Sequence, residues 1–143
     1  MPSYYLHTDN AKLALAAIAK GLTSVRLSTD LNISEQDFAV NAEGLILDED
    51  NQLSLADLKK MVKKTGRIYL CSDGEMDPLE DRSVGYYKLA PTSGAPLLEI
   101  SGVKMHISKG TDPFTSASEM AQQAVSKGDR VLDCCSGLGY AAI

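Results

Sequence analysis

The stretch that decides the fold is Gly128-Asp-Arg-Val-Leu-Asp-Cys-Cys-Ser-Gly-Leu-Gly-Tyr-Ala-Ala-Ile143. It predicts a short apolar strand at residues 131 and 132 that ends at Asp133, then a glycine loop with Gly137 and Gly139, then the start of a helix. Because glycine has no Cβ, the loop can adopt positive φ and a ligand can approach its backbone closely. A strand, a glycine loop and a helix in this order are typical of a cofactor-binding unit. We therefore expect a small-molecule site at this loop.

The spacing of the loop separates several cofactor classes. A dinucleotide-binding Gly-x-Gly-x-x-Gly motif needs a third glycine at position 142, where this chain has Ala142. That motif also tolerates alanine there, so a nicotinamide cofactor stays an alternative. A Walker-type phosphate loop is excluded, because no Gly-Lys-Ser/Thr follows the glycines.

The string Val131-Leu-Asp-Cys-Cys-Ser-Gly-Leu-Gly-Tyr140 resembles the first motif of class I S-adenosylmethionine-dependent methyltransferases. In that family the glycine loop passes under the methionine part of the cofactor, and the acid at the strand end helps to order the loop. The resemblance implies S-adenosylmethionine as the cofactor. It implies these cofactor-contacting residues: Asp133, Cys135, Ser136, Gly137, Gly139 and Tyr140. The alternative is an ordinary strand-to-helix turn that uses glycine only for its geometry.

A second segment extends the resemblance upstream. Ala95-Pro-Leu-Leu-Glu-Ile-Ser-Gly-Val-Lys-Met-His106, followed by Lys109-Gly-Thr-Asp-Pro113, looks like a group of predicted archaeal methyltransferases. Those proteins continue for well over a hundred residues beyond the loop, whereas this sequence ends at Ile143. The resemblance therefore implies the N-terminal portion of such an enzyme, truncated just after the first cofactor motif. It leaves the catalytic residues and the methyl acceptor unassigned, and it implies that this chain alone is inactive.

The pattern along the chain predicts two parts. Residues 1–94 are expected to form a small α+β accessory domain. Residues 95–143 are expected to supply the first helix and strand of an incomplete α/β doubly wound, Rossmann-like methyltransferase domain. The best boundary is Pro91-Thr-Ser-Gly-Ala-Pro96, since its prolines and glycine break regular structure.

Caps and hydrophobic periodicity place the individual elements. Helices are expected over about residues 10–20, from a capping box at Ser54 to Gly66, and from a cap at Asp112 to Gly128. A hairpin is expected about residues 41–44. Strands are expected at residues 24–30, 37–41, 45–48, 67–71, 85–90, 97–101 and 104–108, and near Arg130. Gly102 should form a tight turn or bulge.

The composition of the chain limits the expected cellular location and binding partners. The apolar share of 44% is ordinary for a globular protein, no run is long enough to span a membrane, and the first residues show no export signal. Three cysteines, two of them adjacent, make neither a disulfide framework nor a zinc site, so a cytoplasmic location is expected. A net charge of −5 disfavours a large nucleic-acid surface without excluding one. No metal is expected, and the incomplete sheet makes self-association an expectation.

Several single residues have a structural interpretation. Cys71 is expected to be a core thiol, and Met105 and Met120 to fill the core. His106 alternates with its neighbours in an expected strand, and a structural role is favoured over one in the active site. The acidic residues 73–81 read as a surface loop.

Three other functions stay open. The first is a non-catalytic binding or assembly module from a split or truncated gene. The second is a nicotinamide-binding oxidoreductase. The third is an enzyme related to polyamine synthases, which transfers aminopropyl groups with a similar fold and loop.

Overall fold

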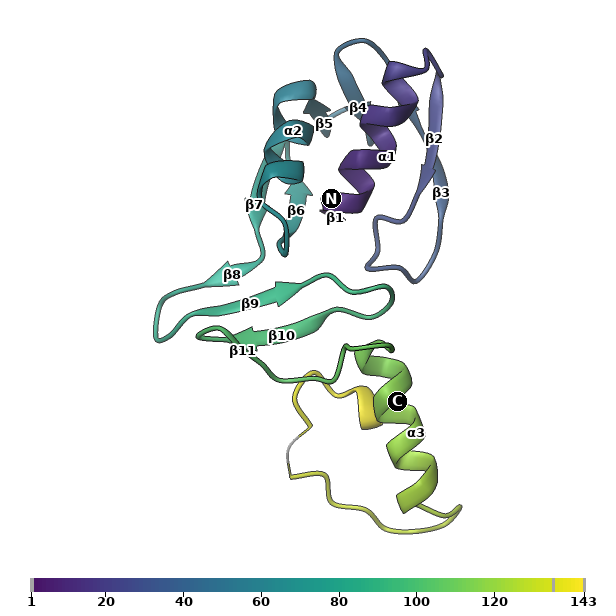
Figure 1. Ribbon diagram of the computed structural model, residues 1–143, viewed down its shortest axis with the longest axis vertical. Coiled ribbons are helices and arrows are strands. Elements are labelled where there is room, and N and C mark those ends of the chain that lie inside the picture. The colour runs from purple at the N-terminus through teal and green to yellow at the C-terminus, as the bar shows by residue number, and fades with distance from the viewer. Residues whose placement is uncertain (1, 135, 143) are drawn as a thin grey trace. The chain divides into compact units, whose positions relative to one another are not determined.

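A computed structural model describes residues 2–134 and 136–142 (Figure 1). The chain divides into two compact units, of which the first ends at Leu79 and the second begins at Glu80. Among the described residues the first unit holds two sheets and two α-helices, and the second holds one sheet and one α-helix.

The first unit contains two antiparallel sheets. One has the strand order β1-β6-β7 and the other the order β2-β3-β4-β5. The strands are β1 (Tyr4–His7), β2 (Ser24–Leu27), β3 (Gln36–Val40), β4 (Gly44–Ile46), β5 (Gln52–Ser54), β6 (Ile68–Ser72) and β7 (Glu75–Pro78). The Tyr5 amide donates to the carbonyl of Thr29 at 2.8 Å beside an isolated parallel bridge to Asp30, so β1 also contacts the segment that follows β2.

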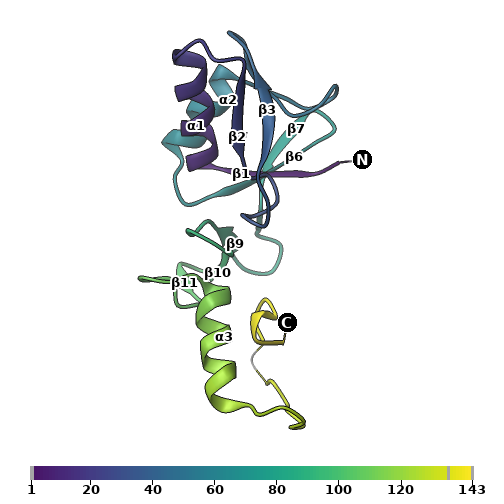
Figure 2. The same cartoon turned by 90° about the vertical axis from the view of Figure 1, so that its right-hand side faces the viewer.

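Two helices, α1 (Thr8–Ala19) and α2 (Leu55–Lys63), pack together on one side of these strands (Figure 2). Each begins with a capping box. At α2 the Ser54 hydroxyl accepts from the Asp57 amide at 3.2 Å, and the Asp57 carboxylate accepts from the Ser54 amide at 3.1 Å. At α1 the cap is His7, whose Nδ1 accepts from the Asp9 amide at 3.3 Å.

The core of the first unit lies between the helices and the strands. Its fully buried members include Leu6, Ala11, Ala14, Leu27, Leu45, Leu58, Met61 and Tyr69. Cys71 joins this core, and burial raises the pKa of its thiol to about 12. The prediction of a core thiol is therefore confirmed.

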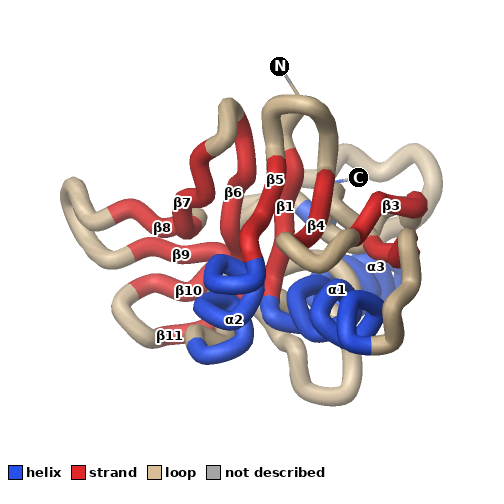
Figure 3. The backbone as a smooth tube through the Cα atoms, turned by 90° about the horizontal axis from the view of Figure 1, so that it is seen from above, coloured by secondary structure: helices blue, strands red, loops and turns tan. Residues whose placement is uncertain are grey.

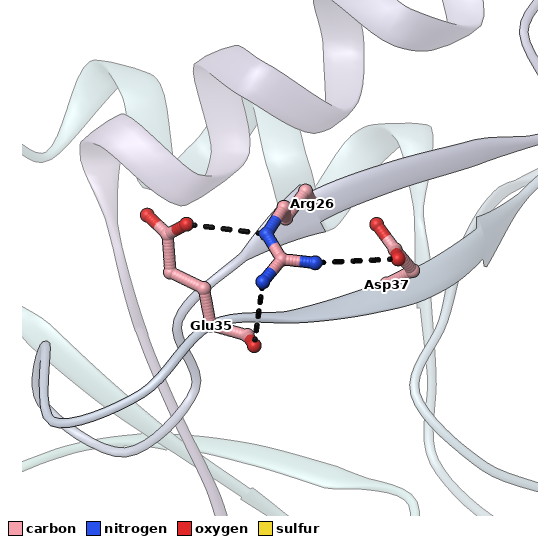
Figure 4. A network of polar contacts seen from close by, with 3 residues as sticks. All are labelled: Arg26, Glu35 and Asp37. Atoms are coloured by element: carbon pink, nitrogen blue, oxygen red, sulfur yellow. Dashed lines mark hydrogen bonds and ion pairs between the residues drawn. The ribbon is translucent and has the colours of Figure 1, made fainter.

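The outer face of β2 and β3 carries an ion-pair network (Figure 4). The Arg26 Nε lies 3.4 Å from a Glu35 oxygen and its Nη1 lies 3.5 Å from an Asp37 oxygen, directly across the strand pair. All three side chains are more than half exposed. Such pairs contribute little stability, about 0–1 kcal/mol each.

The second unit is built on one antiparallel sheet of order β11-β10-β9-β8 (Figure 3). Its strands are β8 (Glu80–Asp81), β9 (Tyr87–Ala90), β10 (Leu97–Ile100) and β11 (Val103–Lys104). Helix α3 (Pro113–Ala124) and a short 3₁₀ helix, η1 (Tyr140–Ala142), follow the sheet. The turn between β10 and β11 has positive φ at Ser101 and Gly102, which confirms the turn predicted at Gly102.

One row of alternating charges crosses this sheet. By register, Glu80 is opposite Lys88, Lys88 is opposite Glu99, and Glu99 is opposite Lys104. The Lys88 Nζ lies 3.1 Å from Glu99, and both side chains are less than a fifth exposed. Opposite charges directly across neighbouring strands favour this register.

The predicted fold class is wrong. In the described residues the strands form three small antiparallel sheets with short helices beside them, and no parallel strand alternates with a helix as a doubly wound domain requires. The strand expected near Arg130 is not formed. Val131 and Leu132 lie in irregular backbone and are 62% and 85% exposed. A strand this short needs a neighbouring strand for its hydrogen bonds, and none lies beside it in the described part of the second unit.

Other sequence expectations differ in detail. The first unit ends at Leu79, whereas the sequence placed the domain boundary between residues 94 and 95. Pro91–Pro96 connects β9 to β10, and these strands pair across it from Ala90 to Leu97. The acidic residues 73–81 are not simply a loop, because they contain β7 and β8. Met105 and Met120 are 43% and 56% exposed, so their interpretation as core filler is wrong.

No helix in the described part of the chain is both long and apolar enough to cross a bilayer.

Candidate functional site

The start of α3 forms one wall of the candidate site, and its cap is well defined. The Asp112 carboxylate accepts from the amides of Phe114 and Thr115 at 3.0 and 3.3 Å and from the Thr115 hydroxyl at 2.6 Å. These hydrogen bonds, with that of the Thr115 side chain foremost, lower the pKa of Asp112. Proline at position 113 suits the first turn. The predicted cap of the third helix is confirmed.

Close packing behind this cap requires a glycine. A Cβ placed on Gly94 would lie 2.8 Å from Cγ of Asp112, which is closer than real carbon atoms approach. Gly94 therefore allows the β9–β10 connection to pass against the start of α3.

The glycine loop forms the opposite wall. Gly137 and Gly139 have φ of +54° and +80°, in the region that favours glycine. The Gly139 amide donates to the carbonyl of Ser136 at 2.7 Å, and the Ala142 amide donates to that of Gly139 at 3.0 Å. The loop is thus a tight turn that leads into η1.

Tyr140 ties the loop to the rest of the second unit. Its hydroxyl donates to the carbonyl of Pro96 at 2.7 Å, just before β10. Its ring meets Phe114 and His106 edge to face, with centroids 6.4 and 5.5 Å away. Burial and the negative charge of Asp112 raise the pKa of Tyr140, so its hydroxyl stays protonated and can donate.

A cavity of about 310 Å³ lies between these walls, entirely within the second unit. Three segments line it: residues 105–107, the first two turns of α3, and the glycine loop. The lining residues are Met105, His106, Ile107, Pro113, Ser116, Ala117, Met120, Asp133, Ser136, Gly137, Tyr140 and Ala141. The apolar side chains come mainly from the first two segments, and the loop brings a carboxylate and a hydroxyl.

Most of the residues that the family resemblance indicated as cofactor-contacting line this cavity. Asp133, Ser136, Gly137 and Tyr140 all line it. Gly139 lies in the same turn but is not among the lining residues. Cys135 falls outside the described residues.

Sequence reasoning missed the role of residues 105–107 as part of the cavity wall. His106 lines the cavity, although a structural role was favoured for it. The Leu98 amide donates to its Nδ1 at 3.2 Å, and burial lowers the pKa of its imidazole. The available signal was the position of His106 inside the upstream segment that shares the same family resemblance.

A smaller cavity of about 210 Å³ lies in the first unit, at the β4–β5 hairpin and the start of α2. Glu43 and Asp57 give it an acidic rim, and none of the predicted site residues lines it. In residues 2–134 and 136–142 no three His, Cys, Asp or Glu side chains cluster as metal ligands would.

Comparison with known proteins finds a relative that this chain matches over part of that relative's length. An uncharacterized protein of Methanocaldococcus jannaschii is 34% identical over 142 residues, which cover 93% of this chain and 47% of that protein. The chain thus spans about half the length of the curated relative that it matches. No protein-family model matches the sequence.

Proposed function

We propose that this chain is the N-terminal part of an S-adenosylmethionine-dependent methyltransferase and supplies the glycine-loop wall of its cofactor site. One observation carries the proposal: Asp133, Ser136, Gly137 and Tyr140, picked from the motif alone, line one cavity. The loop residues in a purely geometric strand-to-helix turn need not face a cavity at all.

The chemistry of the cavity fits the amino-acid end of the cofactor. Asp133 offers a carboxylate to an ammonium group, and the Ser136 hydroxyl can donate or accept a hydrogen bond. The positive φ and missing side chain of Gly137 let a ligand approach the backbone. Met105, Ile107 and other apolar residues offer a wall for an aliphatic chain.

The size of the cavity limits what this chain does. At about 310 Å³ it lies at the lower end of the range for small-molecule pockets, so it suits part of a cofactor rather than a cofactor with its methyl acceptor. When bound, S-adenosylmethionine supplies an electrophilic sulfonium methyl group. The residues described here bind and orient the donor, and none is assigned as a catalytic base.

Calorimetric titration of the chain with S-adenosylmethionine, S-adenosylhomocysteine and NAD⁺ tests the proposal. We expect the two sulfur compounds to bind and NAD⁺ not to bind. Asp133→Asn should weaken binding by about tenfold, because it removes the charge that faces the ammonium group. Asp50→Asn is the matched control: it removes the same charge from an exposed turn of the first unit and should leave affinity unchanged. Binding of NAD⁺ alone would support an oxidoreductase instead.

A second candidate function is a non-catalytic assembly module, which the exposed apolar side chains of the second unit favour. Val131, Leu132 and Met120 are each more than half exposed. Val131 and Leu132 are adjacent in the chain, and neighbouring exposed apolar side chains are typical of interaction surfaces. A chain that associates but binds neither sulfur compound would support this candidate over the methyltransferase.

We also propose that the protein is cytoplasmic, because the free thiols Cys71 and Cys134 suit a reducing compartment.

A further inference from the structure

Leu98 of β10 makes two hydrogen bonds to residues 105 and 106, and one of them is to the imidazole ring of His106. The Met105 amide donates to the carbonyl of Leu98 at 2.9 Å, and the Leu98 amide donates to Nδ1 of His106 at 3.2 Å. The turn at Ser101 and Gly102 makes this possible by folding the chain back on β10. A hydrogen bond from the backbone of β10 therefore fixes the position of the His106 ring.

The bond from Leu98 also fixes the tautomer of the ring. Nδ1 accepts a hydrogen bond and so carries no proton, which leaves the proton of the neutral imidazole on Nε2. Burial lowers the pKa of His106 from its ordinary value, so the neutral form is the one present near pH 7. The ring accordingly presents an Nε2–H donor.

This donor faces the glycine loop. A Cβ placed on Gly137 would lie 3.2 Å from His106 Nε2 and 3.6 Å from its Cε1, so this edge of the ring lies against the backbone of Gly137. The edge-to-face contact with Tyr140 holds the ring in this orientation. Among the described residues no side chain or carbonyl accepts a hydrogen bond from Nε2.

We propose that His106 is a ligand-binding residue of the cavity, whose Nε2–H donates a hydrogen bond to an acceptor atom, such as a carboxylate oxygen, of the bound ligand. The inference rests on the proposed function, since it takes the cavity as the ligand site. It adds a donor from outside the glycine loop to the carboxylate of Asp133, which lines the same cavity. The two groups together select a ligand end that carries both an ammonium and an acceptor group.

Two substitutions separate this role from a structural one. In His106→Asn the side-chain oxygen replaces Nδ1 and can still accept from the Leu98 amide, but no donor remains at the Nε2 position. In His106→Gln the amide nitrogen replaces Nε2 as donor, and the acceptor at the Nδ1 position is lost. Affinity for S-adenosylhomocysteine is measured by calorimetry, and stability by urea unfolding, for the wild-type chain and both variants.

If His106 donates to the ligand, His106→Asn should bind about tenfold more weakly and His106→Gln within about threefold of the wild type. Stability should show the opposite order. Long-range ¹H–¹⁵N spectra of the rings, with only His7 as the other histidine, should place the proton on Nε2 and show its signal shifting on titration. Wild-type affinity in His106→Asn, or a proton on Nδ1, would overturn this inference alone. Absence of any binding by the wild-type chain would overturn the proposed function and this inference with it.

Discussion

The two glycines of the loop offer a matched pair of substitutions. Both have positive φ, so alanine at either position pays the same kind of backbone cost, about 1–2 kcal/mol. They differ in their surroundings. A Cβ on Gly137 would lie 3.2 Å from His106 Nε2, whereas a Cβ on Gly139 would meet no atom within 4 Å.

The extra effect at Gly137 can be worked out from this geometry. A separation of 3.2 Å is tighter than ordinary van der Waals contact, so the His106 ring must move by a few tenths of an ångström. Its Nδ1 is bonded to the Leu98 amide, so that movement strains the bond, and the new methyl group occupies cavity space. We expect Gly137→Ala to weaken binding of S-adenosylhomocysteine about tenfold more than Gly139→Ala does, which corresponds to about 1.4 kcal/mol.

Calorimetric titration of both variants measures the difference in affinity, and urea unfolding measures the shared backbone cost. Similar losses of stability with unequal losses of affinity are the expected result. Equal affinities in the two variants, or a larger loss in Gly139→Ala, would refute the assignment of Gly137 to the binding surface.

Three further predictions concern stability and association. Burial lowers the pKa of His7, so the folded state resists its protonation and the free energy of unfolding should fall as pH drops below about 6.5. His7→Asn keeps a capping side chain, and urea unfolding should show that its free energy of unfolding depends less steeply on pH than that of the wild type. An equally steep pH dependence would contradict this. A Cβ in Gly44→Ala would overlap the carbonyl oxygen of Leu53, so urea unfolding should show a loss of about 1–3 kcal/mol, and wild-type stability would count against the predicted overlap. Replacing exposed Val131 and Leu132 with serine should reduce concentration-dependent association in sedimentation velocity, and unchanged association would exclude this segment as the contact surface.

Local signals in the sequence predicted local structure well. The capping box at Ser54 and Asp57 and the cap at Asp112 were found because a cap needs only residues within one turn of the helix. The hairpin predicted about residues 41–44 is confirmed, with Val40 opposite Leu45. Its turn is encoded by side chains that bond their own neighbours: the Asn41 side chain accepts from the amides of Glu43 and Gly44.

The sheets were harder to predict, because a strand forms only where a second segment pairs with it, and a short stretch of sequence does not show which segments pair. Strand β7 lies in the acidic residues 73–81, where polarity indicated a loop, and it forms because Cys71 of β6 pairs with Met76 across a tight turn. Conversely, Val131 and Leu132 have a strand-like composition but no partner strand among the described residues. Composition sets how well a side chain suits a sheet, and pairing decides whether a sheet exists.

The candidate site shows the same division within a single cavity. Asp133, Ser136 and Gly137 are close in the chain, and their spacing was enough to single them out. The position of His106 in the cavity was missed because residues 104–108 were expected to form a strand. In such a strand His106 would alternate with Met105 and Ile107, which favoured a structural role for its side chain. The strand instead ends at Lys104, and the ring is then fixed by the amide of Leu98, eight residues earlier on β10. The role of His106 depends on where β11 ends, and the residues around His106 carry no pattern that shows this end. The Nε2–H donor that faces the glycine loop could therefore be found only from the pairing of β10 with β11.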